Sequence, residues 1–124
     1  MFIEHDQAQL YAVDFGAGPQ TLLAHGGWIG SWELWAEPFA YLSKSWRTAA
    51  YDHRGSGATI APVESITMEN MAAALFAVMD KLEIQKCILA GESADRFPCT
   101  DRYPNGNRAG PANPTYHPQS ASKR

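Results

Sequence analysis

The stretch Lys86-Cys87-Ile88-Leu89-Ala90-Gly91-Glu92-Ser93 indicates how this chain folds. Its first five residues, Lys86–Ala90, form a short apolar run without alternating polar side chains, which predicts a strand buried on both faces. The run leads directly into Gly91 and Ser93. In an open parallel sheet, functional groups gather at the carboxyl ends of the strands, and Ser93 is expected at such an end.

A helix is predicted immediately before this strand, from about Met68 to Leu82. Thr67 is placed to cap it, and Glu69 suits the positive end of its dipole. A helix of this length between two strands predicts a right-handed crossover that joins parallel neighbours. The apolar side chains that recur at helical spacing and form one face are Met71, Leu75, Val78, Met79 and Leu82.

Two earlier strands also end in motifs that contain glycine. Thr21–Ala24 is a second run without alternation, and it leads into His25-Gly26-Gly27-Trp28. Arg47–Tyr51 is another predicted strand, and Asp52-His53-Arg54-Gly55-Ser56-Gly57 follows it directly. The two glycines and the aspartate of this motif demand a tight turn. All three motifs are therefore expected at the carboxyl ends of strands.

An opening hairpin and a short helix complete the predicted elements. Phe2–His5 and Leu10–Phe15 predict two strands joined through the polar residues Asp6–Gln9. Trp35–Leu42 predicts a short helix, in which Pro38 is acceptable only in the first turn. The sequence thus predicts an α/β fold with a mostly parallel sheet and an amino-terminal antiparallel hairpin.

Length and composition limit the classes of function. The chain has 124 residues, enough for one domain, and its 45% hydrophobic and 19% charged residues are ordinary for a globular protein. A net charge of −3 argues against nucleic acid as a partner. The longest apolar stretch, Met71–Met79, is far shorter than the roughly 20 residues that span a membrane. Met1–Gln7 lacks the pattern of a signal peptide, so we expect a cytoplasmic protein.

The two cysteines, Cys87 and Cys99, predict neither a disulfide framework nor a metal site. Two residues are too few for such a framework in a chain of this length, and their spacing does not match a metal-binding motif. Cys87 falls inside a predicted buried strand, beside Ile88, and is therefore expected to be an inert thiol.

The composition changes abruptly at Asp95. Residues 1–94 carry a net charge of −6, whereas residues 95–124 carry +3, hold five of the eight prolines and contain no Val, Ile, Leu or Met. Such a segment buries too little apolar area to offset the backbone entropy of folding, so residues 95–124 are predicted to be a disordered tail. A shifted reading frame would produce such a change, and we hypothesise that the tail is out of frame.

The three glycine-bearing motifs together resemble the amino-terminal half of an α/β-hydrolase in their order and spacing. The resemblance covers residues 1–94, which it implies are the amino-terminal part of an α/β-hydrolase domain. It implies hydrolysis of ester-like bonds by acyl transfer, with a small-molecule substrate and no cofactor or metal. Membrane and nucleic acid are not expected partners.

The resemblance also implies roles for individual residues. Ser93 would be the nucleophile on a sharp turn, with Gly91 allowing the close backbone approach. The backbone amides of Gly27 and Ala94 would form the oxyanion hole. The residues that would shape the surrounding loops without taking part in the chemistry are His25, Gly26, Asp52, Arg54, Gly55 and Gly57.

The sequence departs from the family pattern directly after Ser93. Asp95 stands where a small residue, usually glycine, is expected, and the proline-rich tail replaces the helix, the acid and the histidine that should follow. Asp101 and His117 have formally suitable side chains, but a flexible segment would give a triad no rigid support. We therefore expect turnover near background.

The alternative to a hydrolase is a non-catalytic fragment or an interaction module without enzymatic function. The strand Lys86–Ala90 would lose a neighbour on one side, and an exposed sheet edge favours self-association. The sequence does not specify the substrate, the reaction subtype or the oligomeric state.

Overall fold

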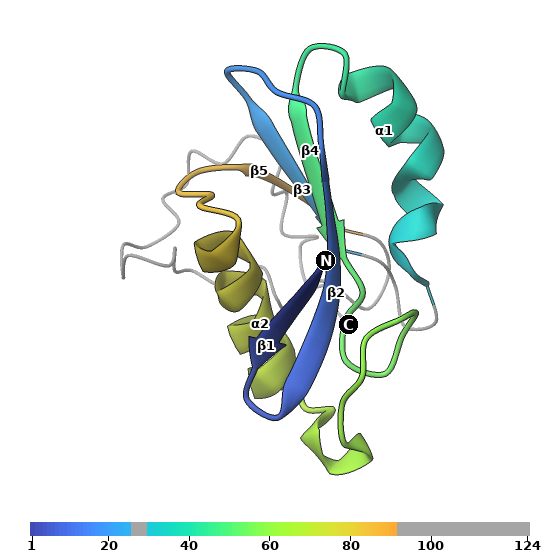
Figure 1. The fold of residues 1–124 in the computed structure, drawn as a ribbon, viewed down its shortest axis with the longest axis vertical. Helices are drawn as coiled ribbons and strands as arrows, with labels where there is room; N and C mark the ends of the chain where they lie inside the picture. The colour runs from blue at the N-terminus through green and yellow to red at the C-terminus, as the bar shows by residue number, and fades with distance from the viewer. Residues whose placement is uncertain (26–29, 92–124) are drawn as a thin grey trace, which may run out of the picture.

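The computed structural model describes residues 1–25 and 30–91 (Figure 1). Every predicted strand and helix is present, with ends that differ by no more than two residues, and the short 3-10 helices η1 and η2 are additional. The elements in chain order are β1 (Phe2–His5), β2 (Ala8–Phe15), β3 (Thr21–His25), η1 (Trp32–Trp35), α1 (Ala36–Leu42), β4 (Arg47–Tyr51), η2 (Val63–Ser65), α2 (Met68–Lys81) and β5 (Ile88–Gly91).

The strands form one mixed sheet in the order β1-β2-β4-β3-β5. The hairpin strands β1 and β2 are antiparallel, and β2 is antiparallel to β4, whereas β3 is parallel to both β4 and β5. The predicted α/β architecture with an amino-terminal hairpin is thereby confirmed. The predicted tail, residues 95–124, lies outside the described residues.

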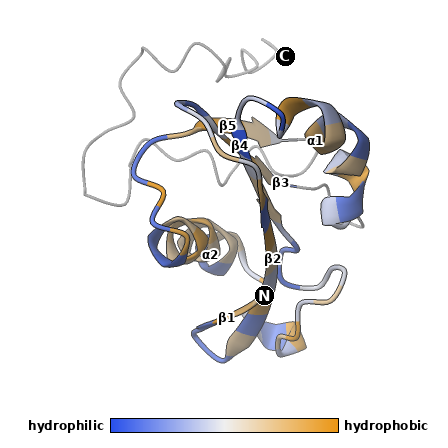
Figure 2. Cartoon of the chain, turned by 45° about the horizontal axis from the view of Figure 1, so that its top comes forward, coloured by the Kyte–Doolittle hydropathy of each residue, from blue (hydrophilic) through white to orange (hydrophobic). Residues whose placement is uncertain are grey.

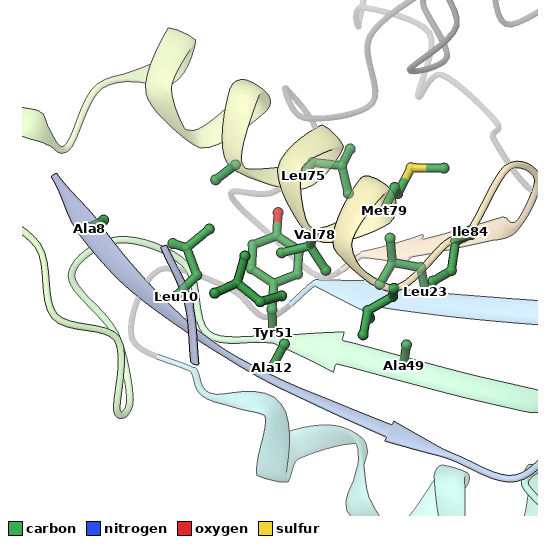
Figure 3. Packing of buried hydrophobic residues seen from close by; sticks show 13 residues of the cluster. Ala8, Leu10, Ala12, Leu23, Ala49, Tyr51, Leu75, Val78, Met79 and Ile84 are labelled. Carbon is green, nitrogen blue, oxygen red and sulfur yellow. The ribbon is translucent and has the colours of Figure 1, made fainter. Parts of the chain in front are cut away.

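The two helices cover opposite faces of the sheet (Figure 2). Alternation along the strands divides their side chains, so that Leu23 and Ala49 pack in the cluster under α2, whereas Ala24 and Ala50 pack in the cluster with Phe39 of α1. Figure 3 shows the ring of Tyr51 pointing from β4 toward α2, close to Val78. Cover on both faces explains why the sequence of β3 lacks polar alternation. The strand predicted as buried at Lys86–Ala90 is instead only partly buried, because among the described strands β5 lies at the end of the sheet.

The helix α2 forms as its sequence predicts. Thr67 is its N-cap, and the hydroxyl Oγ1 accepts a 3.2 Å hydrogen bond from the amide of Asn70. Four of the five residues of the predicted apolar face lie inside α2, and the fifth, Leu82, is its C-cap residue. All five are buried.

The hairpin turn is tighter than predicted. Asp6 and Gln7 have φ angles of +43° and +63°, so two residues reverse the chain and β2 already begins at Ala8. Positive φ at both central positions matches the twist of the flanking strands. The longer Asp6–Gln9 connection was expected because the sequence has no glycine or asparagine there to mark such a turn.

Candidate active site

The carboxyl ends of β3, β4 and β5 meet at one edge of the sheet. In the strand register, His25 pairs with Tyr51 of β4 on one side and with Gly91 of β5 on the other. The three predicted motifs therefore begin at neighbouring positions. The predicted site residues Gly26, Gly27, Ser93 and Ala94 lie outside the described residues.

Two buried histidines lie against each other at this edge. The rings of His25 and His53 stack with centroids 5.3 Å apart and an interplanar angle of 14°, and the ring of Tyr51 meets His25 edge-on at 5.2 Å. His53 Nδ1 donates a 2.7 Å hydrogen bond to the carbonyl oxygen of Arg54, which fixes the ring orientation. Sequence reasoning gave His53 no role, although it lies within the second motif.

The carboxylate of Asp52 is buried and accepts hydrogen bonds on both oxygens. Oδ1 accepts from the amide of Trp32 at 2.7 Å, and Oδ2 accepts from the amide of Ala58 at 2.8 Å. The residue is only 1% exposed. Because backbone amides donate to both oxygens, this carboxylate is suited to hold the backbone at Trp32 and Ala58 and not to transfer protons.

The loop that follows β4 is closed by its own hydrogen bonds. Ser56 Oγ donates to the carbonyl oxygen of His53 at 3.0 Å, and Thr59 Oγ1 donates to that of Asp52 at 2.6 Å. Gly57 has a φ of +52°, and a Cβ there would collide with the carboxylate of Asp52. Only glycine therefore fits beside Asp52 without displacing the carboxylate.

Arg54 connects the same loop to the first hairpin. Its side chain is fully buried, and Nη2 donates to the carbonyl oxygens of His5 and Asp6 at 3.0 and 2.9 Å. Nη1 donates to Ser65 Oγ of η2 at 2.9 Å. A buried guanidinium whose hydrogen bonds go to such neutral oxygens serves to join segments of the fold.

The described residues suggest neither a metal centre nor a membrane span. Across residues 1–25 and 30–91, no group of three or more His, Cys, Asp or Glu side chains is placed to hold a metal ion. Every helix within that same part of the chain is too short or too polar to cross a membrane.

The sequence matches a known family and several of its members. The family model described as alpha/beta hydrolase fold matches residues 20–94. A "Putative non-heme chloroperoxidase" of Synechocystis is 35% identical over 86 residues, which cover 68% of this chain and 30% of that protein. A "Putative carbamate hydrolase RutD" of Pseudomonas syringae is 32% identical over 78 residues, 62% of this chain and 30% of that protein.

Solved structures agree on the fold. The epoxide hydrolase VrEH1 of Vigna radiata superposes on 79% of this chain with a TM-score of 0.72 and 24% identity, and the match covers 32% of that protein. The enol-lactonase of Burkholderia xenovorans gives the same TM-score and identity over 39% of its length. The chain thus spans about 30% of the length of the curated relatives described above.

Proposed function

Because the chain belongs to the alpha/beta hydrolase fold family, we propose that it carries the nucleophile and the oxyanion hole of a hydrolase that cleaves ester-like bonds by acyl transfer. The observation that carries this proposal is the pairing of His25 with Gly91 across β3 and β5. Gly27 and Ser93 each follow one of these paired positions by two residues. The register therefore supports a site built from both motifs.

The proposed chemistry assigns one role to each residue. The Oγ of Ser93 attacks the carbonyl carbon of the substrate and loses its proton to water, and the negative charge that develops on the carbonyl oxygen is met by the amides of Gly27 and Ala94. When the carbonyl forms again, the bond to the leaving group breaks, and water then hydrolyses the acyl-serine. One such donor is typically worth about 2.7 to 4 kcal/mol in the transition state. The names of the relatives, among them a carbamate hydrolase and an enol-lactonase, support a small-molecule substrate. The mechanism needs no cofactor or metal.

Turnover by the 124-residue chain is proposed to be near background. A serine hydroxyl is a poor nucleophile without a positioned base, and residues 95–124 do not follow the family pattern of helix, acid and histidine. The oxyanion hole and substrate binding alone would give only residual rate enhancement.

A serine-directed fluorophosphonate probe tests the assignment of Ser93. Because no base is positioned, the adduct should form slowly, but the expected result after prolonged exposure is one adduct, located on Ser93 by mass spectrometry and lost in Ser93→Ala. Ser43→Ala serves as the control, because Ser43 follows α1 outside the proposed site, and this variant should label as the wild-type chain does. Absence of an adduct at Ser93, or equal labelling of several serines, would exclude the proposed nucleophile.

A second candidate function is an interaction module without catalysis. Among the described strands, β5 lies at the end of the sheet and pairs with β3 alone. The backbone groups on the other side of such a strand are available for pairing with a second copy of the chain. Sedimentation velocity at low concentration distinguishes the outcomes. A defined oligomer supports the module, whereas concentration-dependent, polydisperse aggregation contradicts it.

A further inference from the structure

We propose that Asp52 is a positioning residue that fixes the start of η1, where the connection from β3 ends. This inference rests on the proposed function, because that connection contains Gly27, the proposed oxyanion donor. A donor to a developing oxyanion must be held accurately, since small displacements cost much of its effect. The evidence comes from the described residues that flank this connection, His25 on one side and Trp32 on the other.

On the η1 side, the carboxylate of Asp52 holds the amide of Trp32. The 2.7 Å hydrogen bond from this amide to Oδ1 joins residues 20 positions apart in the sequence. The acceptor is ionic and buried, which makes such a hydrogen bond stronger than one between neutral groups. Trp32 is the first residue of η1, so the bond fixes the point at which the connection ends.

Asp52 is itself held from three directions. Its amide donates to the carbonyl oxygen of Tyr11 at 2.9 Å, and its carbonyl oxygen accepts from Thr59 Oγ1. Thr59 Oγ1 in turn accepts from the amide of Tyr11 at 2.9 Å. The second carboxylate oxygen binds the amide of Ala58. The backbone of Asp52 is thus anchored to β2, and hydrogen bonds to both oxygens fix the orientation of the carboxylate.

On the β3 side, His25 provides the other fixed point. It is the last residue of β3, is paired in the sheet with Tyr51 and Gly91, and stacks on His53. The described residues at the two ends of the connection are therefore held, His25 as a buried residue paired in the sheet and the half-buried Trp32 by its hydrogen bond to Asp52. With the β3 end held by the sheet, Asp52 is the side chain that sets the position of the other end.

Amide hydrogen exchange, measured by NMR on the full 124-residue chain, directly tests the hydrogen bond between the Trp32 amide and Asp52. Asp52→Ala removes both acceptors, so protection of the Trp32 amide should fall at least about tenfold. The matched control is Asp14→Ala, which removes a carboxylate that is bonded to Arg47 instead. Protection of the α2 amides normalises each variant for its global stability.

Gly57→Ala provides a second variant that keeps the charge of Asp52. The added methyl group displaces the carboxylate, and the Trp32 amide should again lose protection. Gly55→Ala is its control, because Gly55 also has a positive φ, +89°, but a Cβ there meets the side chain of Ile66 and not Asp52. Equal protection of Trp32 in Gly57→Ala and Gly55→Ala would overturn the proposal.

The rate of phosphonate labelling distinguishes a positioning role from a merely structural one. In Gly57→Ala, labelling of Ser93 should slow at least about tenfold relative to Gly55→Ala. If Trp32 loses protection but Ser93 labels at the control rate, Asp52 does not position the site. A wild-type chain that does not label at Ser93 counts against the nucleophile, and the exchange data then decide separately whether Asp52 holds Trp32.

Discussion

Arg54 Nη2 donates a 2.9 Å hydrogen bond to the carbonyl oxygen of Asp6, which lies 48 residues earlier in the sequence. Asp6 adopts a positive φ in the turn between β1 and β2. The same guanidinium binds the carbonyl oxygen of His5 and the hydroxyl of Ser65. The loop after β4, the first hairpin and η2 are therefore tied together by one buried side chain.

Replacement of Arg54 by methionine should destabilise the fold strongly. Arg54→Met keeps much of the side-chain length but leaves the two turn carbonyls without their donor, and we expect the free energy of unfolding to fall by about 2 to 4 kcal/mol. Urea denaturation followed by tryptophan fluorescence measures this. Lys44→Met is the control, since it removes an exposed positive charge. A loss no larger than that of the control would show that the hairpin is held by other contacts.

Loss of the N-cap should weaken α2 moderately. Thr67→Ala removes the hydroxyl that accepts from the Asn70 amide, which typically costs about 1 kcal/mol. Thermal unfolding measures the change, and Thr67→Ser, which retains the hydroxyl, should stay close to wild type. Equal stability of the alanine and serine variants would mean that the cap contributes nothing measurable.

Local sequence patterns predicted most of the fold. Apolar residues three and four positions apart predicted the buried face of α2, and β4 was predicted with its observed ends, Arg47 and Tyr51. The strand β2 was predicted two residues too short, because the conformation of Asp6 and Gln7 is imposed by the sheet and by Arg54 rather than by their own preferences.

The meeting of the three strand ends was predicted from the sequence, but the contacts of the described residues there were not. The order of strands and motifs was enough to place the motif ends of β3, β4 and β5 at one edge of the sheet. The hydrogen bond of Asp52 to Trp32 and the stacking of His25 on His53 join side chains and backbone from separate segments. No spacing rule encodes such contacts, since they arise only when β3 and β4 pair. The roles of Ser93 and Gly27 stay predictions.

Cys87 is half-buried just before β5, not inside that strand as predicted, and its thiol should still resist alkylation. Desolvation raises its pKa from 9.0 to about 11, so the reactive thiolate is scarce at pH 8. In a Cys99→Ser background, iodoacetamide should modify Cys87 slowly at pH 8 and rapidly after unfolding in urea. Modification of the folded chain at the rate of the unfolded one would contradict the burial.

The same shift makes stability depend on pH. The folded state holds the thiol proton more tightly than the unfolded state, so the contribution is complete below pH 9 and is lost as the pH rises to about 11. Cys87→Ala removes this dependence. Between pH 8 and 11, the denaturation midpoint of the Cys99→Ser chain should therefore fall relative to that of the same chain carrying Cys87→Ala. Parallel curves would rule out the shift.

Arg47 of β4 binds a carboxylate on β2 and a backbone carbonyl at the end of α2, and the contributions of these two contacts to stability can be measured separately. Its guanidinium binds both carboxylate oxygens of Asp14, at 3.1 and 2.7 Å, and Nη2 also donates to the carbonyl oxygen of Leu82 at 2.7 Å. The ion pair is partly exposed, so Asp14→Asn should cost only about 0.5 to 1 kcal/mol, and less in 1 M salt. Arg47→Met also removes the donor to Leu82, the C-cap of α2, and should cost about 1 kcal/mol more at either salt concentration. Urea denaturation of both variants at low and high salt measures the difference, and equal losses in the two variants would assign the whole effect of Arg47 to Asp14.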